Sequence, residues 1–291
     1  MILLEATLAG LVLGGMYALV ALGLNLQYGV ARIMNLAYGE GVIVAAFAAW
    51  WLYTAGGINP IFGLALILPA AFAVNWLIYR LALTPLVRRA KLREQLEVDS
   101  ILATFGLLFV VQGLMLVAFG GAYYSYGFLS VPVVIADVTI AANRLLALGF
   151  ALVLGLALYL ALTRTRIGTA VRAVAVDPVA AGLVAIDVRQ VAAASFALGG
   201  ALVAAGGVLV SMFLTFNANI GVVFTMKALI VVIMGGVGNL LGCLVAGLIL
   251  GLTETFVATW VDPGLTLAAT YAIFLAILLV RPQGLFGRAA R

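Results

Sequence analysis

The chain has 291 residues, of which 66% are apolar and only 9% are charged, and its formal net charge is +5. A soluble domain carries about 25% charged residues, and a soluble fold with this composition would have to leave an excess of apolar side chains in water. The composition therefore excludes an ordinary soluble protein and predicts an integral membrane protein. Because the apolar runs are long and lack alternating polar residues, they favour helices over a β-barrel.

We expect one transmembrane domain over residues 1–291, an all-α bundle of about eight to nine helices. In chain order the apolar runs are 6–28, 36–54, 61–83, 99–119, 144–163, 190–213, 222–258 and 264–280. Gly235-Gly236-Val237-Gly238-Asn239 interrupts the run 222–258, which we interpret as a short descending helix followed by an ascending one. Irregular backbone at membrane depth persists only where protein or a wet cavity covers it, so the break is a candidate part of a transport path.

Positive charge alternates between the loops. Loops 55–60, 120–143, 214–221 and 259–263 contain no Lys or Arg. The basic residues of the other loops and the tail are Arg80, Arg88, Arg89, Lys91, Arg93, Arg164, Arg166, Arg172, Arg189, Arg281, Arg288 and Arg291. The positive-inside rule then predicts that loop 164–189 and the C-terminus are cytoplasmic and that the N-terminus is periplasmic.

A short internal similarity links the first and sixth runs. Leu13-Gly14-Gly15 resembles Leu198-Gly199-Gly200. On the predicted topology the two helices run in opposite directions, as an inverted repeat requires.

Loop 164–189 is rich in Ala, Val and Leu, which is not typical of a disordered linker. Asp177-Pro178 predicts a helix start, with Asp as the N-cap and Pro at the first position, and residues 178–185 as a short helix. Such a helix outside the lipid favours docking into a groove on another protein. The alternative is a helix that lies on the membrane surface.

Three ionisable residues, Glu40, Lys227 and Glu254, fall within or near apolar runs, where charges usually face a bundle interior or an aqueous path. Glu40 has the alternative role of a structural partner for a neighbouring helix. Lys227 and Glu254 have the alternative of extending to the outer headgroups.

Absences narrow the chemistry. Neither of the two lysines, Lys91 and Lys227, follows a glycine, so the chain has no phosphate-binding loop and any ATP must bind to another chain. There is no histidine, and the single cysteine, Cys243, lies in an apolar run. We therefore expect no catalytic residue, cofactor or metal in this chain, and no nucleic-acid binding.

Five stretches carry a resemblance to a known family. They are Gly14-Gly-Met-Tyr-Ala-Leu-Val-Ala-Leu-Gly with Asn35-Leu-Ala-Tyr-Gly-Glu, Ala103-Thr-Phe-Gly-Leu, Thr165-Arg-Ile-Gly-Thr-Ala-Val-Arg-Ala-Val-Ala-Val-Asp with Ile186-Asp187, Lys227-Ala with Gly235-Gly-Val-Gly-Asn and Glu254, and Arg281-Pro-Gln-Gly-Leu-Phe-Gly. From end to end, the chain resembles the membrane permease subunit of branched-chain amino-acid ABC importers. It departs from that family's usual pattern at Tyr38, where a His is usual, and at Ala185, where a Gly is usual.

The resemblance implies a bacterial inner-membrane assembly with a second homologous permease, two cytoplasmic ATPases that bind ATP and Mg, and an extracytoplasmic substrate-binding protein. It implies transport of branched-chain amino acids or of similar small amino acids, amides or carboxylates. Expected residues of the coupling loop are Arg166, Gly168, Arg172, Asp177, Pro178 and Ala181. Candidate residues of the translocation path are Asn35, Tyr38, Glu40, Lys227, Gly235, Gly236, Gly238, Asn239 and Glu254.

Three alternatives remain at this point. A stand-alone secondary transporter with inverted repeats should have paired, buried ionisable groups near the midplane of the membrane. An intramembrane enzyme is disfavoured because the chain has no His and no catalytic pair. A structural subunit without a path is disfavoured by the break at 235–239.

Overall fold

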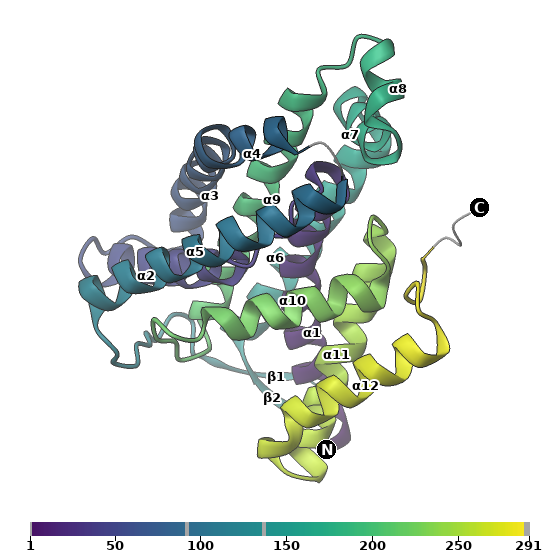
Figure 1. Cartoon of the computed structure of the whole chain (residues 1–291). Coiled ribbons are helices and arrows are strands. Elements are labelled where there is room, and N and C mark those ends of the chain that lie inside the picture. Colours follow the sequence, from purple (N-terminus) through teal and green to yellow (C-terminus); the bar gives the residue numbers. More distant parts are fainter. Residues whose placement is uncertain (1, 91–92, 136–137, 288–291) are drawn as a thin grey trace.

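A computed structural model describes residues 2–90, 93–135 and 138–287 (Figure 1). Lys91, Arg288 and Arg291, which the sequence assigns to basic segments, lie outside these residues. The elements are α1 (Ile2–Leu26), the π-helix η1 (Gln27–Ala31), α2 (Tyr38–Thr54), α3 (Pro60–Ile78), the π-helix η2 (Tyr79–Leu83), α4 (Thr84–Arg89), α5 (Arg93–Phe119), β1 (Pro132–Ile135), β2 (Val138–Ala141), α6 (Ala142–Arg164), α7 (Arg166–Val176), α8 (Pro178–Leu183), α9 (Val188–Ser211), α10 (Gly221–Gly235), α11 (Leu240–Trp260), the 3-10 helix η3 (Pro263–Leu265) and α12 (Thr266–Val280).

The predicted all-α membrane bundle is confirmed. Within the described part of the chain, seven helical segments are long and apolar enough to cross a membrane. Two further helices are shorter, α2 with 17 residues and α10 with 15. Together they agree with the expected eight to nine helices. The run 222–258 divides where the glycines predicted, because α10 ends at Gly235 and α11 begins at Leu240.

The order of a long, a short and a long helix occurs twice, in α1–α2–α3 and in α9–α10–α11. The contacts are reciprocal, since the long helix α1 packs along α11 while α9 packs along α3. Helices α1 and α9 cross in opposite directions (Figure 1). Asn59 and Asn239 each cap the third helix of their half, accepting hydrogen bonds from the amides of Ile61 and Gly242. This arrangement fits the predicted inverted repeat.

Glycines allow the long helices to approach closely. A methyl group on Gly14 would overlap the backbone of Leu248 in α11, and one on Gly200 would overlap the side chain of Asn75 in α3. Both glycines belong to the matching Leu-Gly-Gly motifs, so each motif places a small residue at the contact with the other half. Close backbone approach at small residues is the usual way in which helices associate in lipid.

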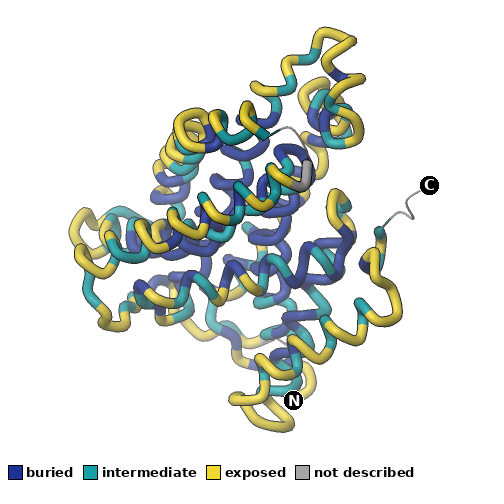
Figure 2. The backbone as a smooth tube through the Cα atoms, viewed as in Figure 1, coloured by how far each residue is buried: buried dark blue, intermediate teal, exposed yellow. Residues whose placement is uncertain are grey.

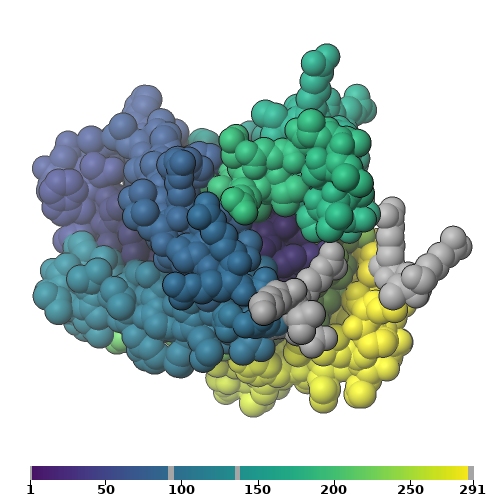
Figure 3. Space-filling model, turned by 45° about the horizontal axis from the view of Figure 1, so that its top comes forward, coloured from purple at the N-terminus to yellow at the C-terminus, as the bar shows by residue number. Residues whose placement is uncertain are grey.

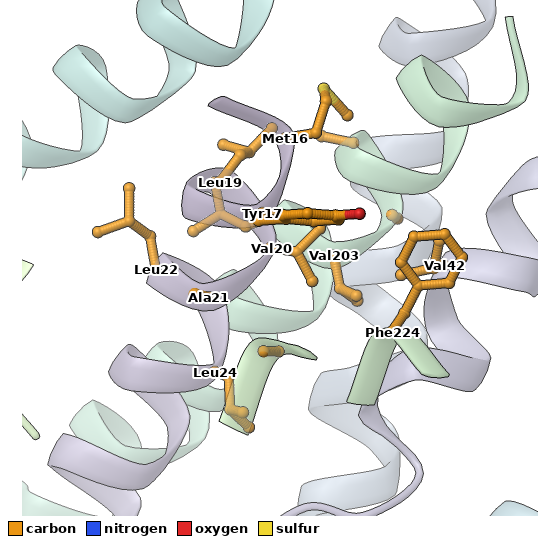
Figure 4. Packing of buried hydrophobic residues seen from close by; sticks show 14 of the residues in the cluster. Met16, Tyr17, Leu19, Val20, Ala21, Leu22, Leu24, Val42, Val203 and Phe224 are labelled. Atoms are coloured by element: carbon orange, nitrogen blue, oxygen red, sulfur yellow. The ribbon is translucent and has the colours of Figure 1, made fainter. Parts of the chain in front are cut away.

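Helices α1 and α9 form the centre of the bundle, and most of α9 is buried (Figure 2). Buried side chains of α1, among them Leu19, Val20 and Leu24, pack with Val203 of α9 and Phe224 of α10 (Figure 4). Helices α3, α5 and α12 instead expose large apolar side chains, as expected for helices that face lipid.

The two ends of the bundle differ. At one end, near the N-terminus, the segment predicted as a loop forms an antiparallel hairpin in which Val133 of β1 pairs with Ile140 of β2 (Figure 1). An aromatic cluster lies there, in which Phe47 and Phe216 are buried and Phe119 is partly buried, with the rings of Phe47 and Phe119 stacked 4.1 Å apart. At the other end stand α4, α7 and α8, which we call the arginine-rich end.

Candidate functional site

The first turns of the two short helices, α2 and α10, meet inside the bundle. The hydroxyl of Thr225 in α10 accepts a hydrogen bond from the amide of Gly39 (2.8 Å) and donates one to the carbonyl oxygen of Leu36 (3.2 Å). A methyl group on Gly39 would overlap the carbonyl oxygen of Gly221. We call this contact between residues 36–40 and 221–225 the α2–α10 junction.

Glu40 lies in this junction, in the first turn of α2. Its side chain is completely buried, and neither carboxylate oxygen has a hydrogen-bond partner among the described residues. The carboxylate lies against Gly221, where a methyl group would overlap it. Glu40 is therefore not a hydrogen-bonded or ion-paired partner of a neighbouring helix, which was one of its two predicted roles. A carboxylate is electrostatically favoured beside the first turn of a helix.

The segment that leads into α2, residues 32–37, is held by α5 and by the end of α1. The hydroxyl of Ser100 accepts from the amide of Met34 (3.2 Å), and the hydroxyl of Thr104 accepts from the amide of Leu36 (3.0 Å). Asn35 donates to the side chain of Gln27 (3.1 Å), while the amide oxygen of Asn35 is buried without a partner in the part of the chain that the structure describes. Asn35 and Glu40 therefore both bring unpaired acceptors to this part of the bundle.

Tyr38, another candidate path residue, reaches from α2 to two other helices. Its buried hydroxyl donates to the carbonyl oxygen of Val20 in α1 (2.7 Å) and lies 3.3 Å from that of Gly199 in α9. The Tyr38 side chain therefore ties α2 to the crossing of α1 and α9.

Lys227, which is partly buried, and Glu254, which is buried, form an ion pair with 2.8 Å between Lys227 Nζ and Glu254 Oε2. The same oxygen accepts from the hydroxyl of Tyr17 (2.8 Å), and Glu254 Oε1 accepts from Thr270 (2.8 Å). The two side chains thus meet each other, and an unpaired charge inside the bundle would cost more than this hydrogen-bonded pair. The pair joins α1, α10, α11 and α12.

The glycine break lies against the C-terminal motif. The amide of Leu285 donates to the carbonyl oxygen of Met234 (2.7 Å), and the side-chain amide of Asn239 donates to the carbonyl oxygen of Phe286 (3.0 Å). The amide of Gly238 donates to the side chain of Asn25 (2.7 Å). Gly236 and Gly238 have positive φ angles of 97° and 82°, which favour glycine. Gly235 and Gly236 are buried, whereas Val237 and Gly238 are exposed, so protein covers only the first part of the irregular backbone.

The path candidates thus fall into three places. Asn35, Tyr38 and Glu40 lie at or next to the α2–α10 junction. Lys227 and Glu254 form the ion pair. Residues 235–239 lie beside the C-terminal motif. Sequence reasoning missed the partners that connect these places, of which Thr225 and Tyr17 are the clearest. Within residues 2–90, 93–135 and 138–287, no three His, Cys, Asp or Glu side chains are placed to hold a metal ion.

The loop 164–189 contains two helices rather than one. The predicted helix after Asp177 is present as α8, and Asp177 Oδ1 accepts from the amides of Val179 (2.9 Å) and Ala180 (3.1 Å). The preceding helix α7 was not predicted; its N-cap is Thr165, which accepts from the amide of Gly168 (3.0 Å). Figure 3, with the arginine-rich end turned forward, shows this segment standing out from the surface.

The expected coupling residues divide into exposed and buried ones. Arg166, Arg172 and Asp177 are exposed, and Pro178 is partly buried. Ala181 is buried, as is Gly168, where a methyl group would overlap carbonyl oxygens at the end of α6. The last two therefore shape the α7–α8 unit rather than its outer surface. The large exposed apolar side chains of the unit are Ile167, Val176, Val179, Leu183 and Val184.

Arg32 connects the α7–α8 unit to the junction. Its guanidinium donates to the carbonyl oxygen of Ala175 near the end of α7 (3.1 Å). Arg32 itself ends η1 in a left-handed conformation, φ 56°, and begins the segment that leads to α2. A displacement of α7 would therefore act directly on residues 32–37.

Comparisons with known proteins agree with this architecture. The family described as "Branched-chain amino acid transport system / permease component" matches residues 6–281. The high-affinity branched-chain amino acid transport system permease protein LivH of Salmonella typhimurium is 28% identical over 309 residues, 98% of this chain and 96% of the relative. LivH of Escherichia coli K12 and BraD of Pseudomonas aeruginosa are each 27% identical over the same shares of both chains. No solved structure matches the chain significantly.

The Lys227–Glu254 pair is the feature expected of the secondary-transporter alternative. The comparisons nevertheless support a permease subunit and not a stand-alone transporter, because the relatives are permease proteins along nearly their whole length. With the family matched over residues 6–281, this chain belongs to the permease components of branched-chain amino acid transport systems.

Proposed function

We propose that this chain forms the translocation path for branched-chain amino acids, or for similar small amino acids, amides or carboxylates, in an ATP-driven importer. The substrate follows from the names of the relatives. The observation that carries the coupling is the bond between Arg32 and Ala175, which joins the protruding α7–α8 unit to the segment that enters the bundle.

The α7–α8 unit has the surface of a docking element. Val179 and Leu183 of α8 are 74% and 85% exposed, and Arg166 and Arg172 of α7 are exposed beside them. An apolar helix face outside the lipid, flanked by arginines, fits a groove on a cytoplasmic protein with complementary charge. The partner we propose is an ATPase that binds ATP and Mg.

The α2–α10 junction is the part of the path that we expect to move. Short helices that begin inside a membrane bundle present partial positive charge at their first turns, which suits the carboxylate of an amino acid. Glu40 and the amide oxygen of Asn35 are unpaired acceptors in the same region, which suits an ammonium group. Exposure of this junction to alternate sides would be driven through Arg32 when the ATPases bind and hydrolyse ATP.

The assembly we propose contains a second homologous permease, two cytoplasmic ATPases and an extracytoplasmic binding protein in the bacterial inner membrane. The basic residues at the arginine-rich end support a cytoplasmic position for residues 164–189 and for the C-terminus, with the N-terminus periplasmic.

The coupling is tested with Arg172→Glu, because Arg172 is exposed and has no hydrogen bond or ion pair within the described residues. We expect the reconstituted transporter to lose uptake and substrate-stimulated ATP hydrolysis while the chain stays in the membrane. Asp177→Arg should do the same by removing the cap of α8. The exposed Arg144, in α6 at the opposite end, provides the control Arg144→Glu, which should keep ATP hydrolysis coupled. Normal substrate-stimulated ATP hydrolysis in Arg172→Glu would contradict the assignment.

A further inference from the structure

A groove opens at the arginine-rich end, between the η2–α4 segment and the start of α9. Its volume is about 560 Å³, and a hollow of about 490 Å³ with shared lining residues adjoins it. We call the two together the arginine groove, defined by Trp76, Arg80, Thr84, Arg88, Arg89 and Arg189. Only Arg189, in the first turn of α9, falls within the loop 164–189, and none of these residues is a candidate residue of the path.

The arginine groove has excess positive charge. Its four arginines are exposed, and none of them has an ion pair among the described residues. One carboxylate, that of Asp187, lines the groove, and its Oδ1 caps α9 by accepting from the amides of Arg189 and Gln190 (both 3.1 Å). The groove therefore offers several guanidinium groups to an anion, and guanidinium groups bind phosphate strongly.

Local structure shapes the groove. The π-helix η2 widens the chain between α3 and α4, and such bulges are frequent at functional sites. The guanidinium of Arg80 stacks over the ring of Trp76, with its carbon 4.8 Å from the ring centre. Tryptophan is typical of the membrane–water interface, which is the depth of lipid headgroups.

An apolar stripe leads from the groove into the membrane region. Leu81, Leu77 and Val74 are 67%, 50% and 55% exposed. Their spacing places them on one face of the helix, one turn after another. A soluble anion would make no use of this stripe, whereas the acyl chains of a lipid would cover it.

We propose that the arginine groove binds the phosphate headgroup of an anionic phospholipid, with the acyl chains along Val74, Leu77 and Leu81. Basic pockets between transmembrane helices on the cytoplasmic side recognise anionic headgroups in this way. The proposal goes beyond the transport function and does not depend on which substrate is carried.

Native mass spectrometry of the full chain in mild detergent tests the proposal, with phosphatidylglycerol and phosphatidylcholine of identical acyl chains as probes. We expect retained phosphatidylglycerol and much weaker phosphatidylcholine binding. At about fivefold for each arginine, Arg80→Gln with Arg88→Gln should weaken phosphatidylglycerol binding roughly 30-fold. The control Arg164→Gln, which removes an exposed arginine at the end of α6, should leave binding unchanged.

Fluorescence provides a test that does not need the double variant to fold. Brominated phosphatidylglycerol should quench Trp76 more than brominated phosphatidylcholine does, with Trp76→Phe used to isolate its signal from the other tryptophans. Equal quenching by both lipids, unchanged lipid binding in the double variant, or displacement of the lipid by millimolar inorganic phosphate would each overturn the proposal. Retention of neither lipid by the purified chain would also overturn it.

Discussion

Two buried carboxylates, Glu254 and Glu40, face the same short helix α10 under opposite conditions. Both oxygens of Glu254 are hydrogen-bonded, and Lys227 supplies a countercharge at 2.8 Å. Neither oxygen of Glu40 has a partner among the described residues. The middle of α10 is thus bonded to neighbouring helices. Its first turn instead packs against the Glu40 carboxylate, which has no hydrogen-bond partner among the described residues.

This difference between the two carboxylates indicates which part of α10 can change position at a low cost in free energy. Moving the middle of the helix would separate the Lys227–Glu254 ion pair, which is strongly unfavourable in a membrane bundle. Moving the first turn would break the hydrogen bonds of Thr225 but no ion pair among the described residues, and it would uncover the Glu40 carboxylate. We therefore expect α10 to pivot about Lys227. Each prediction below uses the melting temperature of the purified chain in detergent.

The largest effect should follow from removing one member of the ion pair. Lys227→Met leaves Glu254 buried without a countercharge, which costs about 3–5 kcal/mol. For a chain of this size, the melting temperature should fall by roughly 6–12 °C. The matched double variant, Lys227→Met with Glu254→Leu, removes both charges and should recover most of the loss. If each single variant melts within about 2 °C of the wild type, the ion pair does not fasten α10 and the comparison fails.

A smaller loss should follow from crowding the α2–α10 junction. Gly39→Ala places a methyl group against the carbonyl oxygen of Gly221, and overpacking of this kind costs about 1–3 kcal/mol. The melting temperature should fall by roughly 2–6 °C. Gly106→Ala in α5 is the control, because nothing lies within 4 Å of the added methyl group. Since alanine favours helix over glycine, the control should melt at or slightly above the wild-type temperature. A fall equal to that of Gly39→Ala would refute close packing at the junction.

Patterns among residues that are close together in the sequence were sufficient to predict much of this architecture. Apolar runs gave the membrane helices, and Gly235 with its neighbours marked the end of α10. Asp177 followed by Pro178 predicted the start of α8, because a cap depends only on residues within one turn. Helix α7 was missed even though Thr165 provides the same kind of cap. The signal was available there, but the arginines of the segment favoured a loop.

Contacts between distant segments could not be predicted in the same way. Tyr17 and Glu254 are 237 residues apart, and their contact depends on how α1 packs along α11. The Lys227–Glu254 pair had no such signal, since Lys227 lies 8 residues before Gly235 and Glu254 lies 15 residues after Asn239. Two antiparallel helices joined at that break would not by themselves bring the two residues level. Glu40 gave no sign of its missing partner, because an absence of hydrogen bonds is visible only in three dimensions.

The smallest change in stability, and the sharpest test of the comparison, should come from Glu40→Gln. An amide of nearly the same shape replaces a carboxylate that makes no hydrogen bond, so the melting temperature should stay within about 2 °C of the wild type. Uptake by the reconstituted transporter should nevertheless fall at least about tenfold, because the loss of a charge-assisted contact to a moving or ammonium-bearing group costs 1.5 kcal/mol or more. Glu254→Gln is the matched control. It should clearly lower the melting temperature, because both oxygens of Glu254 are hydrogen-bonded. If Glu40→Gln leaves uptake unchanged, the unpaired carboxylate takes no part in transport, and the contrast between the two ends of α10 is one of packing alone.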